Sequence, residues 1–122
     1  MTRALAVFTV SLRGLRLRVR LLPTEADVDH ECRQYEGRRQ RGTPTARAFF
    51  APAKKLCSVA GTIVLPATGP LAELVPHEVV HAVMHRIGGV HCTDDERLAT
   101  DVGLLTARIL RRLALHGIEV AS

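Results

Sequence analysis

The sequence predicts an α+β fold, in which a short mixed or antiparallel sheet is followed by two helices in the C-terminal half. Residues 14–22 alternate between aliphatic and basic side chains, with the period of two that a half-buried strand requires. Residues 71–87 are apolar almost all round, which is typical of a buried helix. Residues 93–116 repeat aliphatic side chains at helical spacing behind a polar helix start.

The chain has 122 residues, of which 47% are hydrophobic. This length supports one core and is too short for two, so we expect a single domain over residues 1–122. No apolar run reaches the roughly 18 residues that a membrane-spanning helix needs. The first twelve residues carry an arginine and a short apolar run, like a secretory signal, but they lack a small-x-small cleavage site. We therefore expect a strand of the mature fold there.

Three cysteines, Cys32, Cys57 and Cys92, make an odd set without Cys-x-x-Cys spacing. Such a set argues against a disulfide framework, and a reducing compartment is the simpler inference, so we predict a cytoplasmic protein. Cys92 is close enough to the motif described below to be an alternative metal ligand. A buried thiol is the commoner role for such a residue.

Local signals place the other elements of the first half. Thr24 is a suitable N-cap for a helix that runs to Tyr35 and stops at Gly37. Gly14 is the only turn-forming residue between two expected strands. The expected strands cover residues 4–12, 14–22, 46–51 and 57–65, with a basic loop over residues 38–44 and a turn over residues 66–70.

The next helix is expected to begin near Pro70 or Leu71 and to end at the glycine pair 88–89. Pro76 leaves two alternatives open, because a proline in a helix interior removes one backbone hydrogen bond. The helix either starts anew at Pro76, as a first-turn proline permits, or bends at that point. A last helix over residues 93–116 stops at Gly117, and its apolar face consists of Leu98, Val102, Leu105, Ile109 and Leu113.

Residues 77–81 read H-E-V-V-H, the most specific chemical signal in the chain. On a helix, His77 and His81 lie one turn apart on one face, where both imidazoles can bind one tetrahedral Zn²⁺. Glu78 can reach a metal-bound water without being a ligand, which is the general-base role that this motif assigns to it. We expect all three side chains to be buried, a cost that a metal would offset. The alternative is a pair of incidental core histidines.

A catalytic zinc requires a third protein ligand. His85 lies a further turn along the same face, but three histidines in a row on one straight helix cannot surround an ion. His91 and Asp94 lie in an expected loop, and the sequence pattern does not determine the geometry of that loop. Glu96 is the best candidate, because it opens a helix that must return against the motif helix. Residues 93–96 also form a capping box, in which Glu96 would bond the backbone N–H of Thr93, so both roles stay open.

The pattern H-E-x-x-H-x-x-x-H at residues 77–85, followed by E-x-x-A at residues 96–99, resembles the ImmA/IrrE-type minimal metallopeptidases, part of the gluzincin branch of zincins. The resemblance covers residues 57–110 and is specific only at H-E-x-x-H. It implies a small zincin-like domain whose C-terminal helix supplies Glu96 as the third zinc ligand. It also implies that residues 61–65 form the edge strand that pairs with an extended substrate.

The chain departs from this family at two places. Val102 and Gly103 stand where the second family motif usually carries Phe-Ala. The thermolysin-like arrangement, with an aspartate four residues after the ligand glutamate, fails because Asp101 lies one residue late. Asp101 could still orient an imidazole, but we interpret it as a solvent-facing residue of the helix.

These residues predict a zinc-dependent endopeptidase that hydrolyses a peptide bond of a protein or peptide substrate with metal-activated water, and Glu78 is its catalytic base. Family members cleave DNA-binding repressors, so the resemblance implies a regulatory protease. No residue is assigned to the oxyanion, since the only tyrosine, Tyr35, lies on a helix with no evident reason to face the site. The alternative is a non-catalytic interaction protein on the zincin scaffold, whose basic loop at residues 38–41 contacts an acidic partner.

The net charge of +5 indicates an acidic partner, with nucleic acid among the options. The charge is spread along the chain rather than gathered, and the arginines of the strand over residues 14–22 are interpreted as its solvated face. Only 3% of the residues are aromatic and tryptophan is absent, so a base-stacking platform is poorly supported. The arginines in question are Arg16, Arg18 and Arg20 on the strand, Arg38, Arg39 and Arg41 in the loop, and Arg108, Arg111 and Arg112 on the last helix.

Overall fold

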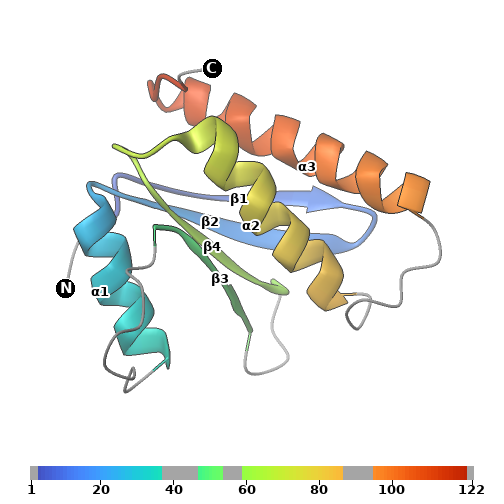
Figure 1. The fold of residues 1–122 in the computed structure, drawn as a ribbon. Helices are drawn as coiled ribbons and strands as arrows, with labels where there is room; N and C mark the ends of the chain where they lie inside the picture. The colour runs from blue at the N-terminus through green and yellow to red at the C-terminus, as the bar shows by residue number, and fades with distance from the viewer. Residues whose placement is uncertain (1–2, 37–46, 54–58, 87–94, 121–122) are drawn as a thin grey trace.

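The computed structural model describes residues 3–36, 47–53, 59–86 and 95–120. Over these residues the chain forms a mixed four-stranded sheet and three helices in the order β1, β2, α1, β3, β4, α2, α3 (Figure 1). The prediction of an α+β fold with a short mixed sheet is therefore confirmed. No helix in the described ranges combines the length and the apolar character needed to cross a membrane.

Strands β1 (Ala6–Leu12) and β2 (Leu15–Leu22) form an antiparallel hairpin in which Leu12 pairs with Leu15. The two residues between them, Arg13 and Gly14, have φ angles of 49° and 83°. Positive φ at both central positions is the signature of a type I′ turn, whose twist matches that of the flanking strands. Glycine adopts this backbone conformation without strain, which explains why Gly14 stands at the turn.

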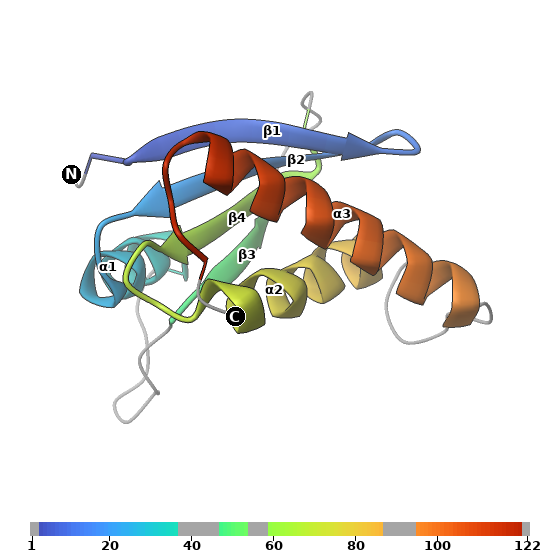
Figure 2. The same cartoon turned by 90° about the horizontal axis from the view of Figure 1, so that it is seen from above.

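Strand β4 (Gly61–Pro66) pairs in parallel with β2, and β3 (Phe49–Pro52) pairs antiparallel with β4. The strand order is β1-β2-β4-β3, so β4 is an interior strand of the sheet. The expectation that residues 61–65 form an edge strand is therefore wrong. Among the described strands, β1 and β3 occupy the two edges (Figure 2).

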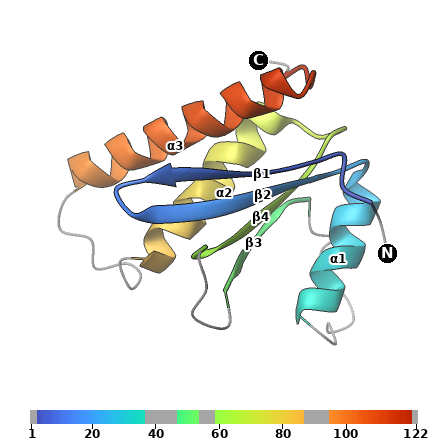
Figure 3. The same cartoon turned by 180° about the vertical axis from the view of Figure 1, so that it is seen from behind.

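Helix α1 (Glu25–Glu36) covers part of one face of the sheet (Figure 3). Its start is fixed as predicted, since the Thr24 hydroxyl accepts a hydrogen bond from the Asp27 backbone N–H at 3.2 Å and the Asp27 carboxylate accepts one from the Thr24 backbone N–H at 3.2 Å. The Arg20 guanidinium on β2 donates two hydrogen bonds to Glu31 on α1, at 2.8 and 3.0 Å. This bidentate pair ties α1 to the sheet and raises the pKa of Arg20.

Helices α2 (Leu71–Arg86) and α3 (Asp95–Leu115) lie side by side on the opposite face of the sheet (Figure 2). Helix α2 is one helix that contains Pro76, so the alternative of a new start at Pro76 is excluded. Helix α3 ends in a Schellman motif, in which the Ile118 N–H donates to the Leu113 carbonyl and Gly117 adopts a φ of 77°. The predicted stop at Gly117 is confirmed, whereas the predicted stop at residues 88–89 lies outside the described residues.

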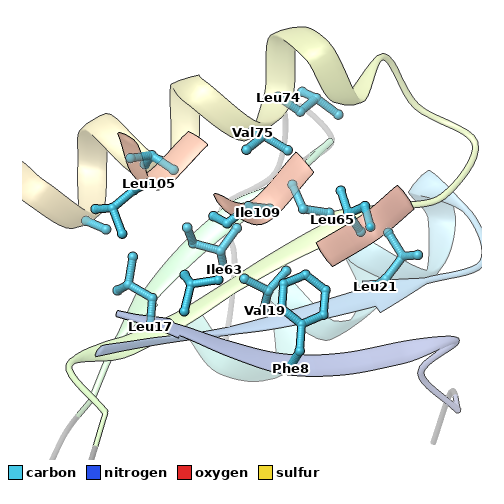
Figure 4. Packing of buried hydrophobic residues seen from close by; sticks show 14 of the residues in the cluster. Phe8, Leu17, Val19, Leu21, Ile63, Leu65, Leu74, Val75, Leu105 and Ile109 are labelled. Carbon is cyan, nitrogen blue, oxygen red and sulfur yellow. The ribbon is translucent and has the colours of Figure 1, made fainter. Parts of the chain in front are cut away.

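The main core lies between the sheet and these two helices (Figure 4). Leu17, Val19 and Leu21 project from β2, and Leu105, Ile109 and Leu113 of α3 meet them with no solvent exposure. Leu98 and Val102 are partly buried against the same core, so the predicted apolar face of the last helix is confirmed. A smaller cluster on the opposite face is formed by Leu22, Val28 and Val64 under α1.

The outer edge of β1 is covered by arginines from α3. The Arg108 guanidinium donates a hydrogen bond to the Ser11 carbonyl, and the Arg112 guanidinium donates one to the Thr9 carbonyl at 3.4 Å. These carbonyls would otherwise be open acceptors for another strand, because an edge strand presents unpaired backbone groups. The edge of β1 is thus partly blocked.

Two glycines provide a matched test of this packing. A Cβ atom at Gly61 would lie 2.6 Å from the Ala51 carbonyl oxygen and 2.6 Å from the Phe50 ring, whereas a Cβ at Gly103 would meet nothing within 4 Å. We expect Gly61→Ala to lower the free energy of unfolding by about 1–3 kcal/mol, because β3 must move away from β4. Gly103→Ala should raise it by about 0.5–1 kcal/mol, because alanine favours the helix. Urea denaturation measures both, and equal effects of the two substitutions would contradict the close approach of β3.

Candidate metal centre

Helix α2 presents its histidines on the side that is not packed on the core. Val75, Val79, Ala82 and Val83 are buried against the sheet and α3. The remaining face carries the histidines of the motif, which is the consequence of the helical period acting on the H-E-x-x-H spacing. Helix α2 therefore has one face that packs on the core and another face that carries the histidines.

The imidazoles of His77 and His81 converge. Their Nε2 atoms lie 3.2 Å apart, and their rings meet edge to face with centroids 4.9 Å apart. Two nitrogen ligands of one tetrahedral zinc, each bonded at about 2.0–2.1 Å, are separated by about 3.3 Å. Without a metal, one Nε2–H can donate to the other Nε2. The separation of the two nitrogens is thus close to that of two ligands of one zinc ion.

The Glu78 carboxyl lies beside this pair, with Oε2 3.9 Å from His77 Nε2. The residue is only 4% exposed, as predicted. Burial raises the pKa of Glu78, and the charges of His77 and His81 oppose that rise. A carboxyl with a raised pKa is better suited to accept and return a proton near neutral pH than an ordinary glutamate is.

The expectation that both imidazoles are buried is wrong. The His77 side chain is 66% exposed, and His81 is also exposed. The reason is that the sheet and α3 cover only the side of α2 that carries its buried residues, and the helical period places both histidines on the other side. The burial cost that a metal would offset therefore applies to Glu78 alone.

A surface hollow of about 720 Å³ contains His77, Glu78 and His81. Its other walls are Met84 and His85 from α2 and residues 48–50 at the start of β3. The Phe50 ring packs against the His85 ring with centroids 5.8 Å apart. Sequence reasoning missed these aromatic wall residues, although two adjacent phenylalanines in a chain with three are a visible signal.

In the described part of the structure, Glu96 does not lie with His77, Glu78 and His81. It is an exposed residue in the first turn of α3 and is not part of the wall of the hollow. Within the described ranges, no three His, Cys, Asp or Glu side chains are grouped closely enough to hold a metal ion. The assignment of Glu96 as third ligand stays a prediction, and its alternative, the capping box, involves a residue outside the described ones. Residues His91, Cys92 and Asp94 also lie outside them.

Two other residues that the sequence analysis considered lie away from the histidines. Asp101 is 3.2 Å from the Arg13 guanidinium in an ion pair, with 19% of its side chain exposed, so its interpretation as a solvent-facing residue is wrong. It contributes to a different cavity between the β1–β2 turn and α3. The Tyr35 hydroxyl donates to the Pro52 carbonyl at 3.3 Å and does not contribute to the wall of the hollow, as expected.

The chain was compared with known families, curated proteins and solved structures. Neither the protein-family models, nor the curated proteins, nor the solved structures give a significant similarity to this chain. The chemistry of the hollow therefore has to be inferred from its own residues.

The raised pKa of Glu78 predicts how the metal-free protein responds to pH. Between the pKa of the unfolded chain and the higher pKa of the folded chain, the folded state binds more protons, so its stability falls as pH rises through that window. Glu78→Gln removes this loss, which amounts to about 1.4 kcal/mol for each unit of the pKa shift. Urea denaturation in the presence of a chelator, from pH 4 to 8, measures the difference.

The matched control for this experiment is Glu73→Gln, which removes an exposed carboxylate from the first turn of the same helix. The fall in stability that the buried Glu78 causes should persist in this variant. A Glu78→Gln profile that runs parallel to that of the wild-type protein would contradict a buried carboxyl with a raised pKa.

Proposed function

We propose that this protein is a zinc-dependent endopeptidase that hydrolyses a peptide bond of a protein substrate. The observation that carries the proposal is the convergence of the His77 and His81 Nε2 atoms, 3.2 Å apart, with the Glu78 carboxyl 3.9 Å from His77 in the same hollow. Two incidental histidines have no reason to share such a hollow with a buried acid. This arrangement matches the chemistry of an H-E-x-x-H site.

In this proposal His77 and His81 hold the metal ion through Nε2. Glu96 is proposed as the third ligand because it lies in the first turn of the helix that returns against α2, and because the family resemblance assigns it this role. When bound, zinc acidifies a water molecule and polarises a carbonyl group. The open side of the hollow leaves room for that water and for a substrate.

Glu78 is the proposed general base and acid. Its carboxylate takes the proton of the attacking water and passes it to the leaving nitrogen of the cleaved bond. Its burial serves this role, because desolvation raises the pKa and makes proton acceptance more favourable. The exposed imidazoles beside it orient toward the hollow rather than toward the core.

The substrate is proposed to bind as an extended strand along β3. This strand lies at a sheet edge and contributes to the wall of the hollow, whereas the edge of β1 is covered by arginines. Backbone hydrogen bonds to the part of β3 before Pro52 would provide affinity that is independent of the substrate sequence, whereas Pro52 has no N–H and its carbonyl accepts a hydrogen bond from Tyr35. The Phe50 and Met84 side chains favour an apolar substrate residue next to the cleaved bond. The resemblance extends the proposal to a regulatory protease with one protein target.

Metal content and cleavage together test the proposal. The wild-type protein should bind about one zinc ion per chain and cleave members of a proteome-derived peptide library, read by mass spectrometry. His81→Ala should lose the metal. Glu78→Gln should keep the metal and lose about 10²–10⁴-fold in cleavage rate, the usual contribution of a general base. His30→Ala, which removes an exposed histidine of α1, is the control and should change neither.

The outcomes of this experiment separate the proposal from its alternative. A wild-type protein that binds zinc and cleaves no peptide is a non-catalytic interaction protein on the same scaffold. The basic loop assigned to that alternative lies outside the described residues. A wild-type protein that binds no zinc rules out the zinc endopeptidase and leaves only an interaction protein without a structural metal.

The third ligand has a separate test. If Glu96 binds the metal, Glu96→Gln should weaken zinc affinity by more than about 100-fold, since even partners of metal ligands contribute 10–100-fold. If Glu96 only caps α3, Glu96→Ala costs about 0.5–2 kcal/mol of stability and leaves the affinity unchanged. Zinc titration against a chromophoric chelator measures the affinity, and Glu73→Gln is again the matched control. An unchanged affinity in Glu96→Gln removes Glu96 from the site.

A further inference from the structure

Five arginines from two segments that are far apart in the sequence lie next to strand β1. Arg16 and Arg18 come from β2, and Arg108, Arg111 and Arg112 come from α3, which packs along β1. We call these five residues the basic edge. The charge that is spread along the sequence is thus concentrated by the fold at one side of the sheet.

The first part of the basic edge lies on the face of the sheet that α2 and α3 do not cover. The side chains of Leu15, Leu17 and Val19 point into the main core, so Arg16 and Arg18 point to the opposite face and are exposed. In the sheet register, Arg16 pairs with Ser11 and Arg18 pairs with Thr9. Helix α1 covers the other half of this face, over Leu22 and Val64. Two guanidinium groups therefore stand next to two hydroxyl groups on an open surface.

The second part is a groove of about 370 Å³ between β1 and α3. Its walls include Thr9, Ser11 and the three arginines of α3, and none of the described residues in these walls is acidic. Arg108 and Arg112 each use a donor on the edge of β1, and Arg112 also lies 5.0 Å above the Phe8 ring. A guanidinium has five N–H donors, so both retain donors for a ligand.

The charge of the basic edge is not neutralised by the described part of the protein. Arg20, Arg33 and Arg47 are paired with Glu31, Asp29 and Glu25, respectively. By contrast, no carboxylate of the described residues pairs with Arg16, Arg18 or Arg111. Arginines that have no carboxylate partner among the described residues attract a ligand that carries repeated negative charge.

We propose that the basic edge binds the phosphate backbone of a duplex nucleic acid. Guanidinium groups match phosphate oxygens with two parallel hydrogen bonds, and threonine and serine hydroxyls are common phosphate donors. Binding is independent of base sequence and does not use stacking, because the basic edge contains no exposed aromatic ring: Phe8 is buried beneath Arg112. An acidic protein fits less well, since a protein interface needs an apolar centre and Leu115 is the only exposed aliphatic side chain in the wall of the groove.

The basic edge and the candidate metal centre lie at opposite edges of the sheet. The strand order places β1 at one edge of the sheet and β3 at the other (Figure 2). The hollow borders β3. A duplex bound at the basic edge therefore leaves the hollow open. The two activities can be lost separately by substitution.

Fluorescence anisotropy with a labelled 20-base-pair DNA duplex of arbitrary sequence, from 50 to 200 mM salt, tests this proposal. The wild-type protein should bind, with an affinity that falls steeply as salt increases. The double variant Arg16→Gln/Arg18→Gln should bind about tenfold or more weakly at 50 mM salt, and the slope of log K against log salt should decrease in magnitude by about 1.8. The control Arg33→Gln/Arg47→Gln removes the same charge from paired arginines elsewhere and should retain the wild-type affinity.

Three results would overturn the proposal. They are an absence of duplex binding by the wild-type protein at 50 mM salt, an equal loss of affinity in the two double variants, and tighter binding of a 20-residue poly-glutamate peptide than of the duplex. The last result would assign the basic edge to an acidic protein. Circular dichroism verifies that each variant is folded, and Arg111→Gln on α3 provides an independent variant should the strand substitutions disturb the hairpin.

Discussion

The burial of α2 against the sheet is the constraint on which the rest of the structure depends. On the side of this helix that faces the core, Val75, Val79 and Val83 are buried against the sheet and α3. Once that packing is satisfied, the helical period leaves one strip of α2 uncovered, and the histidines occupy this strip. Glu78 lies at the border between the two surfaces, which is why its carboxyl is buried although it faces the hollow. The candidate chemistry is thus a consequence of how the core is packed.

Periodicity explains which features the sequence predicts well. The alternation of β2, the apolar face of α3, the cap at Thr24 and the stop at Gly117 are local patterns, and local geometry decides them. The order of strands is not local. Residues 61–65 lie next to the motif helix in sequence, but parallel pairing with β2 draws them into the sheet interior and leaves β3 outside. The exposure of His77 and His81 depends on which side of α2 the sheet and α3 cover, so it could not be inferred from the composition of the helix.

The two edges of the sheet differ in chemistry. Arginine side chains from α3 occupy carbonyl groups of β1, whereas β3 borders a hollow with aromatic and histidine side chains. The first arrangement discourages pairing with a further strand and concentrates positive charge. The second places a sheet edge next to the histidines of the motif. The surfaces of the two proposals, one for a polyanion and one for a peptide, therefore lie at different edges of one small sheet.

The parallel pairing of β2 with β4 has a consequence for the order in which the chain folds. The β1–β2 hairpin closes through a two-residue turn, which costs little chain entropy and can form within microseconds. Strand β4 can join β2 only after a connection containing α1 and β3 has been looped back, and such non-local contacts form slowly. The side of the sheet that carries the hollow is consequently completed late, on top of a hairpin that is already in place. A ligand that binds there would act on the slowest-forming part of the molecule and would favour its completion by mass action.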